Sequence, residues 1–454
     1  MERTLILKTI EKIGEKVRIC GWVNSRRDHG GIVFFDLRDR SGLLQVVCPK
    51  DMAENIKDET AVAIEGEVKA RPEKMVNPEI KTGTVELKAD KIEILGEAET
   101  LPFDLRELNL SLPKLLDFRP LSFKNEKIRA IFKIEEEVVG GFRQALKEMD
   151  FMEFEAPAIV PANAEGGAEI FSVRYYNHEA FLAQSPQLYK QILVNGFERV
   201  FTVCHVFRAE PSVTTRHLSE YISMDAEMGF IESWKDVMGA CEAVVRRIFL
   251  NVGKNQADNL KILNVELPKV SEKIPQLKMR EAQEIIFQRT GRDNRKEPDL
   301  EPEDEREICK WADEKYGSEL IFITHYPVKK RPFYTFADPD DPEYTMSFDL
   351  LCRGSEIVTG GRRINKYQDL LKGMEKKGIG AKNLEFYLQA FQYGMPPEGG
   401  FALGSERVVK QILGLANIRE AALFPRDMER IDLSLSNTPI KKEKNGEQQG
   451  SQKK

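Results

Sequence analysis

The sequence predicts an α+β protein with a small all-β unit at its N-terminus and a larger domain that combines helices with an antiparallel hairpin. Two observations lead to this prediction. Residues 1–100 contain five short apolar runs separated by turn residues. Farther along, amphipathic segments with helical spacing alternate with strand-like runs, and two of those runs flank a polar loop within residues 200–230. We expect the larger domain to be organised around that hairpin.

The composition is that of a soluble globular protein. The chain of 454 residues is long enough for two to three domains, with 41% hydrophobic and 31% charged residues. The net charge of −6 means that any contact with RNA must come from local basic patches. Six scattered cysteines without a CxxC pair argue for reduced thiols and against a zinc or disulfide framework. No apolar run approaches the ~20 residues of a membrane span and the N-terminus lacks a signal peptide, so a cytoplasmic location is expected.

Residues 1–103 are predicted to form the small N-terminal domain. Its apolar runs lie at Val17–Val23, Ile32–Leu37, Leu43–Val47, Thr60–Val68 and Thr84–Leu95. Stretches rich in glycine, asparagine and aspartate separate several of these runs, as expected between short strands. Five strands of this length favour a Greek-key barrel of the OB type.

One face of this barrel combines aromatic and basic side chains. Alternation along the second strand sends Phe34 and Arg38 outward, beside Arg26. An exposed aromatic ring among guanidinium groups is typical of a platform that stacks nucleic-acid bases and holds phosphates. By the same alternation, Gln45 and Glu86 are expected to point outward, and they are candidates for reading base edges. The alternative is that Phe34 is an edge residue covered by another domain.

Residues 104–130 are predicted to be a hinge, because residues 101–130 hold three prolines and little periodicity. An amphipathic helix follows from Lys127. After it, FMEFEAPAIVPA is predicted to be an edge or terminating strand that ends at Pro157, since proline cannot sit within a hydrogen-bonded ladder. Tandem glycines then indicate a loop that carries Glu165.

A second helix is predicted to open in the segment QSPQLYKQ, residues 184–191. Ser185 is expected to be its N-cap, with Pro186 at the first helical position. Lys190 lies about one turn into this helix. Two interpretations of Lys190 stay open: its side chain projects into a pocket, or it is an ordinary solvated lysine on the helix surface.

The central hairpin carries charges at regular spacing. Arg208 and Glu210 share one face of the first arm, and Asp225 and Glu227 share one face of the return arm. Unpaired charges are costly to bury, so these groups either form a salt-bridged solvent face or surround a charged ligand. A ligand with a phosphate, a carboxylate and an amine would need this mixture of charges.

The C-terminal half contains two further segments with site character. Residues 347–363 are predicted to be strand, with two adjacent glycines that allow a ligand close to the backbone. Residues 399–413 are predicted to be a glycine-rich strand that passes into a helix, with Glu406 and Arg407 at the junction. Residues 233–330 show no defensible constellation, and their charged run EPEDERE is expected to be a solvated helix face.

Three of these segments together resemble a known family. FMEFEAPAIV, the set FRAE, TTRHL and DAEM, and GGFALGSERV resemble, in this order, the three signature motifs of the class II aminoacyl-tRNA synthetases. With QSPQLYK added, the chain is similar to the aspartyl-tRNA synthetases of the archaeal short form. The resemblance implies an OB anticodon-binding domain at 1–103, a catalytic domain with an antiparallel sheet flanked by helices at 131–436, and a disordered tail at 437–454. It also implies a homodimer.

The resemblance further implies which residues bind which ligand. For ATP it implies Arg208, Ala209, Glu210, Arg216, His217, Leu218, Tyr221, Glu356, Gly404, Ser405, Glu406 and Arg407. For L-aspartate it implies Glu165, Ser185, Gln187, Lys190, Arg208, Asp225, Thr359 and Arg363. For the anticodon it implies Arg26, His29, Phe34, Gln45, Gly83 and Glu86. Mg²⁺ is expected at Glu356 and Thr359, and the catalytic groups are expected to be Arg208, Arg407 and Glu356.

Elementary chemistry agrees with these roles. Attack of a carboxylate on the α-phosphate of ATP brings two anions together, so fixed cations must screen both reactants. Two cations, Lys190 and Arg363, suit the side-chain carboxylate of aspartate better than the amide of asparagine. Arg362 stands where glutamine is usual in the family and adds a positive charge near the expected substrate, whereas Thr359 keeps the hydroxyl of the usual serine.

The implied function is an aspartate–tRNA ligase that activates L-aspartate with ATP and transfers it to tRNA(Asp). In the family, a histidine at the place of His29 and a small residue near Gly83 accompany relaxed anticodon reading, so charging of tRNA(Asn) is a hypothesis. Alternatives are an asparaginyl-tRNA synthetase and an RNA-binding paralogue without charging activity, although Arg208, Arg407 and Glu356 all remain. An amide-forming relative of the synthetases is a further alternative, but that relative lacks the barrel.

Overall fold

The computed structural model describes residues 1–161 and 170–437. It divides into two compact units, Met1–Glu107 and Leu108–Lys454. The predicted tail almost wholly, and the loop with Glu165, lie outside the described residues.

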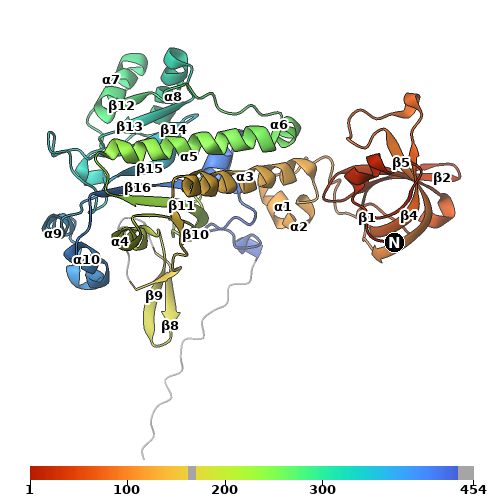
Figure 1. The fold of residues 1–454 in the computed structure, drawn as a ribbon, viewed down its shortest axis with the longest axis horizontal. Coiled ribbons are helices and arrows are strands. Elements are labelled where there is room, and N and C mark those ends of the chain that lie inside the picture. Colours follow the sequence, from red (N-terminus) through yellow and green to blue (C-terminus); the bar gives the residue numbers. More distant parts are fainter. Residues whose placement is uncertain (162–169, 438–454) are drawn as a thin grey trace, which may run out of the picture. The chain divides into compact units, whose positions relative to one another are not determined.

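The first unit is a closed five-stranded barrel with the strand order β1-β2-β3-β5-β4 (Figure 1). The strands are β1 (Lys16–His29), β2 (Ile32–Arg38), β3 (Leu43–Pro49), β4 (Ala61–Ala70) and β5 (Val85–Gly96). Short 3₁₀ helices lie at Ile6–Glu11, Lys50–Ala53 and Glu73–Met75. All five predicted strands are confirmed, because each run alternates apolar residues that fill the barrel with polar residues outside.

The predicted alternation of inward and outward side chains along β2 holds except at its last residue, Arg38. Val33, Phe35 and Leu37 are fully buried in the barrel, as predicted. Arg38 was expected to point into solvent, and this prediction is wrong. Its guanidinium is buried and forms two hydrogen bonds with the Glu59 carboxylate, at 3.0 and 2.9 Å. A buried arginine needs such a partner, so Arg38 serves the barrel and not the outer platform.

The second unit is built on an eight-stranded sheet with the order β12-β13-β14-β15-β16-β11-β10-β6 (Figure 1). Its strands are β6 (Met152–Glu153), β10 (Arg199–Phe207), β11 (Glu220–Gly229), β12 (Gln276–Lys278), β13 (Leu320–Thr324), β14 (Ser347–Cys352), β15 (Ser355–Arg362) and β16 (Glu398–Gly404). A separate three-stranded sheet contains β7 (Ile159–Val160), β8 (Ser172–Tyr175) and β9 (His178–Leu182). The large sheet is antiparallel except at its two edges, where β12 pairs with β13 and β6 pairs with β10 in parallel.

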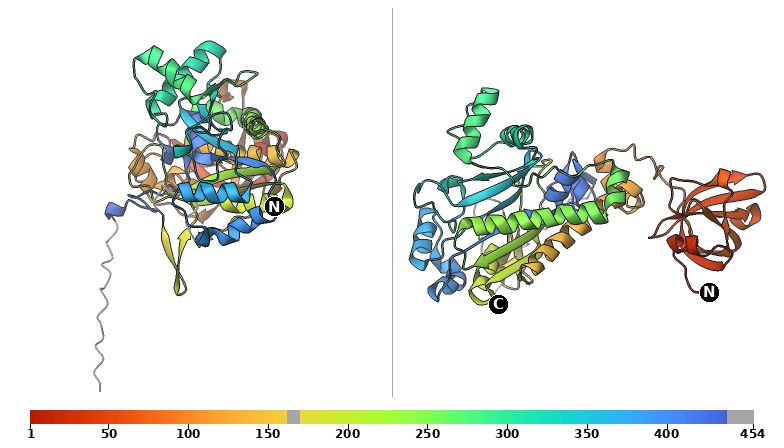
Figure 2. Two further views of the ribbon diagram at one scale, coloured as in Figure 1. Left: turned by 90° about the vertical axis from the view of Figure 1, so that its left-hand side faces the viewer. Right: turned by 45° about the horizontal axis from the view of Figure 1, so that its top comes forward.

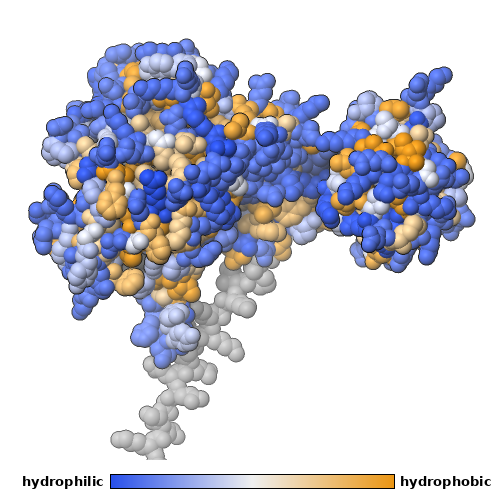
Figure 3. Space-filling view, in the orientation of Figure 1, coloured by the Kyte–Doolittle hydropathy of each residue, from blue (hydrophilic) through white to orange (hydrophobic). Residues whose placement is uncertain are grey.

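Helices cover both faces of this sheet. The helices of this unit are α1 (Leu112–Asp117), α2 (Arg119–Ser122), α3 (Glu126–Glu148), α4 (Gln187–Phe197), α5 (Trp234–Asn255), α6 (Ala257–Leu263), α7 (Met279–Thr290), α8 (Pro302–Tyr316), α9 (Tyr367–Lys376), α10 (Glu385–Gln392) and α11 (Ser405–Leu413). Short 3₁₀ helices lie at Val328–Lys330, Ala381–Leu384, Ile418–Ala421 and Leu435–Asn437. The long helices α3 and α5 lie side by side on one face (Figures 1 and 2), and their outer surface is mostly hydrophilic (Figure 3).

The segment predicted as a hinge contains two short helices, and one prediction about α4 needs correction. Within residues 104–130, helices α1 and α2 lie at 112–117 and 119–122. In both short helices the proline occupies a first-turn position, where its missing N–H costs nothing. Helix α4 begins at Gln187, so Pro186 is its N-cap and Ser185 precedes the helix. The Ser185 hydroxyl still accepts a hydrogen bond from the Gln187 backbone N–H at 3.1 Å.

The register of the large sheet separates a core face from a site face. Phe348, Phe401 and Phe201 belong to the apolar core that includes α3 and α5. One residue along, Asp349 pairs with Thr359, Thr359 with Ala402, and Ala402 with Asp225. Because neighbouring residues of a strand point to opposite faces, this polar row lies on the side away from the core. Strand pairing therefore gathers residues from distant parts of the sequence into one site.

Candidate active site

Lys190 of α4 joins two carboxylates of strand β11. Its Nζ lies 2.9 Å from Oδ1 of Asp225 and 3.1 Å from Oε2 of Glu227. The Lys190 side chain has no exposed surface. Burial alone would lower the pKa of Lys190, but the two carboxylates outweigh it and raise the pKa above its ordinary value. The interpretation of Lys190 as a solvated surface residue is therefore wrong, and so is a solvent face for Asp225 and Glu227.

Arg363, just after β15, brings a second cation to the same place. Its Nε donates to Oε1 of Glu227 at 2.8 Å, and its Nη2 donates to the carbonyl of Gly400 at 3.0 Å. Gly400 pairs with Glu227 in the sheet, and a Cβ at Gly400 would overlap the Glu227 carboxylate. Only glycine lets β16 pass this close. A buried ammonium and a buried guanidinium thus converge on one side of the site.

The other end of the site is formed by the loop between β10 and β11. The guanidinium carbon of Arg208 lies 5.6 Å from the centre of the Tyr221 ring. Thr214 Oγ1 accepts hydrogen bonds from the backbone N–H groups of Arg216 and His217 and lies 2.9 Å from Nδ1 of His217. Burial lowers the pKa of His217, and the positive charge of Arg407 lowers it further. Both effects favour the neutral form of the His217 imidazole.

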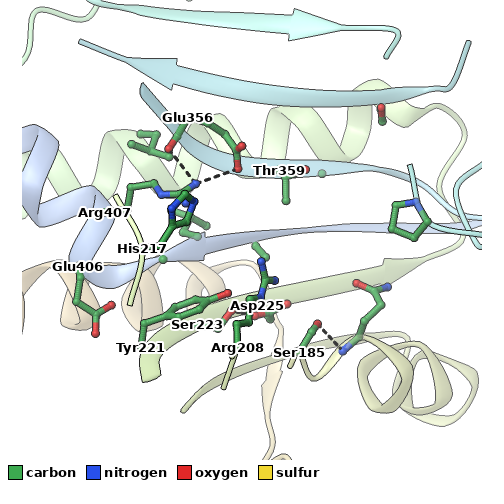
Figure 4. A pocket seen from close by; sticks show the side chains of 18 of the residues that line it. Ser185, Arg208, His217, Tyr221, Ser223, Asp225, Glu356, Thr359, Glu406 and Arg407 are labelled. Carbon is green, nitrogen blue, oxygen red and sulfur yellow. Dashed lines mark hydrogen bonds and ion pairs between the residues drawn. The ribbon is translucent and has the colours of Figure 1, made fainter. Parts of the chain in front are cut away.

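Arg407 and Glu356 point toward each other from α11 and β15 (Figure 4). Nη1 of Arg407 lies 3.4 Å from Oε1 of Glu356, a long contact between half-buried groups. Burial raises the pKa of Glu356 to about 7, with a further contribution from the negative charge of Asp349, whereas Arg407 opposes the rise. This carboxyl lacks sufficient positive charge nearby, so a cation bound at the site would stabilise its ionised form.

Glu406 anchors the helix that carries Arg407. Both of its carboxyl oxygens accept from the backbone N–H of Ile222, at 3.1 and 3.2 Å, and its side chain is buried. Burial raises the pKa of Glu406 to about 8. The contact fixes the start of α11 against β11, which places Arg407 beside the hairpin.

These elements enclose a cavity of about 310 Å³. Most residues predicted for ATP and aspartate line it: Ser185, Gln187, Lys190, Arg208, Glu210, Arg216, His217, Leu218, Tyr221, Asp225, Glu356, Thr359, Arg363, Gly404, Glu406 and Arg407. Ala209 and Ser405 do not line it, and Ser405 is fully buried at the start of α11. Arg362 was expected near the substrate, but it lies outside the cavity lining, and its guanidinium stacks on Phe336 at 4.2 Å.

Two charged residues were missed from the sequence: Arg331, which lines the cavity, and Glu305, which pairs with the cavity residue Arg216. Arg331 donates to Ser347 and Thr359, each at 3.1 Å, and pairs with Asp349 at 2.7 Å. Glu305 was expected on a solvated helix face, but it is nearly buried and pairs with Arg216 at 2.7 Å. Both stand in runs of like-charged residues, KKR and EDERE, where sequence does not distinguish the buried member.

The donor set fits a magnesium ion that is shared with phosphates. Among the described residues, no group of three or more His, Cys, Asp or Glu side chains could hold a metal by itself. Mg²⁺ does not require such a group, because it is commonly held by one or two carboxylates together with substrate phosphates and water. The Glu356 carboxyl, with its raised pKa, and the Thr359 hydroxyl both line the cavity and supply suitable oxygens.

On the barrel, the residues predicted to contact an anticodon lie in two places. The rings of His29 and Phe34 meet edge to face at 5.6 Å. Gln45 donates to Glu86 at 2.9 Å, so these two candidate base readers are paired with each other. A Cβ at Gly83 would overlap the backbone carbonyl of Asn77, which makes glycine the only residue that fits this turn without a shift.

Comparison with known proteins places the chain in a family. Residues 112–428 match the model of the class II tRNA synthetases (D, K and N). The chain belongs to this family. Residues 17–95 match the OB-fold nucleic acid binding domain. These matches confirm the resemblance drawn from the three motifs and the barrel strands.

Relatives and solved structures cover nearly the whole synthetase. The aspartate–tRNA(Asp/Asn) ligase of Aeropyrum pernix is 43% identical over 92% of this chain and 96% of the relative. The aspartate–tRNA(Asp) ligase of Pyrococcus abyssi is 39% identical over 93% and 97%. Asparaginyl-tRNA synthetase from Pyrococcus horikoshii superposes with a TM-score of 0.88 at 30% identity over 95% of this chain and 99% of that one. Aspartyl-tRNA synthetase from Entamoeba histolytica gives 0.84 at 28% identity over 95% and 93%.

None of the helices within residues 1–161 and 170–437 is long and apolar enough to cross a membrane.

Proposed function

We propose that this synthetase is an aspartate–tRNA ligase, which joins L-aspartate to ATP as aspartyl-adenylate and then transfers aspartate to the 3′ end of tRNA(Asp). The observation that carries the proposal is the buried pair of cations at one end of the cavity. Lys190 and Arg363 are already ordered by Asp225 and Glu227, so they present positive charge to a side-chain carboxylate at little further cost in entropy. The relatives from A. pernix and P. abyssi carry the same activity in their names.

The first step needs positioning and charge neutralisation, not a protein nucleophile. The α-carboxylate of aspartate attacks the α-phosphate of ATP, and pyrophosphate leaves. Arg208 contacts both the carboxylate and the α-phosphate, and Arg407 with His217 holds the β- and γ-phosphates. The adenine lies on Tyr221, between its ring and Arg407, with Glu210 accepting from the adenine amino group. Asp225, Ser185 and Gln187 receive the α-amino group of aspartate.

Magnesium belongs to the nucleotide end of the site. Glu356 and Thr359 hold it together with the phosphates of ATP. When bound, the ion neutralises charge on the phosphates and on the leaving pyrophosphate. Arg331, which donates to Thr359 at 3.1 Å, keeps that hydroxyl in place.

The barrel reads the anticodon through Arg26, His29, Phe34, Gln45, Gly83 and Glu86. We further propose that it accepts tRNA(Asn) as well as tRNA(Asp). The A. pernix relative at 43% identity is named for both tRNAs, and the P. abyssi relative at 39% is named for tRNA(Asp) alone. The rigid turn at Gly83 adds no side chain that could select the last anticodon base.

The test is aspartylation of purified tRNA(Asp) and tRNA(Asn) side by side, preceded by pyrophosphate exchange with aspartate or asparagine. Exchange with aspartate alone and charging of both tRNAs is the expected result. Exchange that requires asparagine would favour the asparaginyl alternative, which shares this fold. Exchange with neither would favour a paralogue without activity. Charging of tRNA(Asp) alone would refute relaxed anticodon reading and leave the first proposal standing.

The remaining proposals concern assembly and location. The first-motif segment, α3 with the edge strand β6, forms the interface of a homodimer, and the enzyme works in the cytoplasm. Edge strands are unpaired on one side and are natural sites for such contacts. Light scattering tests the dimer, and a monomeric mass at micromolar concentration would contradict it.

A further inference from the structure

Behind the two cations lies a third acidic side chain that the adenylation chemistry does not use. Glu398 is the first residue of β16 and has no exposed surface. It pairs with Gly229 in the sheet, so it is a diagonal neighbour of Glu227 on the next strand. The buried cluster thus contains two cations, Lys190 and Arg363, and three acids.

A chain of hydrogen bonds ends at Glu398 and determines which of its two carboxyl oxygens can carry a proton. The Tyr387 hydroxyl donates to Oε1 of Gln191 at 3.1 Å. The Gln191 amide therefore turns its Nε2 toward Glu398 and donates to Oε1 of that carboxyl at 2.7 Å. Because Oε1 accepts this bond, any proton on Glu398 is placed on Oε2.

The second carboxyl oxygens of Glu398 and Glu227 are buried and incompletely hydrogen-bonded. Among the described residues, Oε2 of Glu398 is buried and receives no hydrogen bond, whereas Oε2 of Glu227 is buried with the Lys190 ammonium at 3.1 Å but receives no hydrogen bond of good geometry. Two ionised carboxylates side by side in a dry site repel each other strongly, whereas one proton between them satisfies both oxygens. Carboxyl pairs of this kind commonly share a single proton.

We propose that Glu398 is a positioning residue of the aspartate pocket, which carries a proton and donates it in a hydrogen bond to Glu227. The inference rests on the proposed function, because it assigns a role within the aspartate end of that site. With Glu398 neutral, the cluster holds two positive and two negative charges. Glu227 is then held by three partners, and Lys190 and Arg363 keep enough positive potential to attract a further carboxylate.

The surroundings of Glu398 support a protonated state. Burial raises its pKa well above the ordinary value, and the negative charge of Glu227 on β11 raises it further. Gln191 from α4 and Arg363 after β15 oppose this rise, and Tyr387 from α10 contributes a hydroxyl whose own pKa is raised by burial. Lys190 faces the cluster from α4 but is neutralised by Asp225 and Glu227.

The proton matters for the choice between aspartate and asparagine. An ionised Glu398 would give the cluster a net negative charge, which repels a carboxylate and leaves a neutral amide unaffected. The charge state of a residue behind the pocket therefore contributes to selectivity for the acid. The contribution is made through Glu227, without contact with the substrate.

Two substitutions separate this role from simple packing. Glu398→Gln keeps a donor toward Glu227 and cannot ionise, whereas Glu398→Met keeps the volume and removes the donor. In pyrophosphate exchange we expect Glu398→Gln to keep KM for aspartate within about twofold of the wild type, and Glu398→Met to raise it about tenfold or more. KM for ATP should stay within about twofold in both. Glu385→Gln, at an exposed position of α10, is the matched control.

A spectroscopic measurement on the full-length protein is independent of activity. The infrared difference between the wild type and Glu398→Gln should contain the carbonyl stretch of a protonated carboxylic acid. Absence of that band overturns the proposal, as does a Glu398→Gln variant that loses aspartate affinity or a Glu398→Met variant that keeps it. If Glu398→Met does not fold, the aspartate KM of Glu398→Gln and the infrared difference spectrum still test whether Glu398 carries a proton. A wild type without aspartate-dependent exchange refutes the proposed function, whereas the band tests the proton alone.

Discussion

The two ends of the active site are built in different ways. At the aspartate end, Lys190, Asp225 and Glu227 are almost completely buried and meet at 2.9 and 3.1 Å. At the nucleotide end, Arg407 and Glu356 keep 28% and 34% of their side-chain surface exposed and meet only at 3.4 Å. Both ends contain opposite charges from distant segments. They differ in whether those charges form close ion pairs in the protein without ligands.

The difference indicates when each end acquires its final geometry. A buried ion pair is held by the whole fold, because an uncompensated charge there would be costly. A half-exposed pair contributes little and rearranges easily when a ligand arrives. We infer that the aspartate end is organised in the free protein, whereas the nucleotide end is completed by ATP. Selection of the amino acid then depends on rigidity, and ATP binding depends on adaptable arginines.

Lys190→Met is the strongest way to break this comparison. Removing the ammonium leaves Asp225 and Glu227 facing each other in a dry site, which costs about 3–5 kcal/mol. We expect kcat/KM for aspartate to fall more than about a thousandfold in pyrophosphate exchange and the thermal midpoint to drop. Lys372→Met is the control, because the Lys372 side chain is 69% exposed and pairs with the half-exposed Asp369 at 3.1 Å. Near-normal exchange in Lys190→Met would refute an aspartate end organised by this lysine.

Arg407→Ala tests the opposite end and should separate activity from stability. We expect KM for ATP to rise about a hundredfold while KM for aspartate stays unchanged, since the guanidinium is assigned to the phosphates and adenine of ATP and not to aspartate. The thermal midpoint should fall by no more than about two degrees, because a half-exposed ion pair contributes less than about 1 kcal/mol. Arg295→Ala, on the surface with Asp293, controls for the loss of a guanidinium. A large loss of stability would show that this end is also organised in the free protein.

The sequence predicted the elements of the fold better than the state of the charges. All five barrel strands and both arms of the central hairpin follow from alternation and turn residues. The motifs also identified most residues that line the cavity. Local patterns could not show that Lys190 is buried, because the carboxylates that satisfy it stand 35 and 37 positions later on another element. Glu398 and Gln191 were missed for the same reason, since they are 207 positions apart in the sequence and meet only in the fold.

Arg331→Lys tests how the sheet itself is held between the two ends. Three separate nitrogens of Arg331 contact Ser347, Thr359 and Asp349, and a single ammonium cannot replace that planar fork. We expect kcat for pyrophosphate exchange to fall about tenfold and the Mg²⁺ concentration for half-maximal exchange to rise, with KM for aspartate little changed. Lys330→Gln is the control, because Lys330 is half-exposed and pairs with Asp299 at 3.3 Å. Unchanged magnesium dependence would mean that Arg331 supports the strand pair without influencing Thr359.

Glu406→Gln should have the smallest effect on catalysis and refines the comparison through stability, since Glu406 anchors the nucleotide end from a buried position. The pKa of Glu406 is raised from 4.5 to about 8 by burial, so the folded protein keeps a proton that the unfolded chain has lost between these pH values. Stability of the wild type should therefore fall as pH rises from about 4.5 to about 8, by on the order of 4 kcal/mol from this group. Glutamine still accepts from Ile222 but does not titrate, so the variant should gain several degrees in thermal midpoint relative to the wild type at pH 8 and little at pH 5. Parallel pH profiles for the two proteins would mean that the Glu406 carboxylate is stabilised by its hydrogen bonds despite burial, and that the nucleotide end is anchored by an ion and not by a neutral acid.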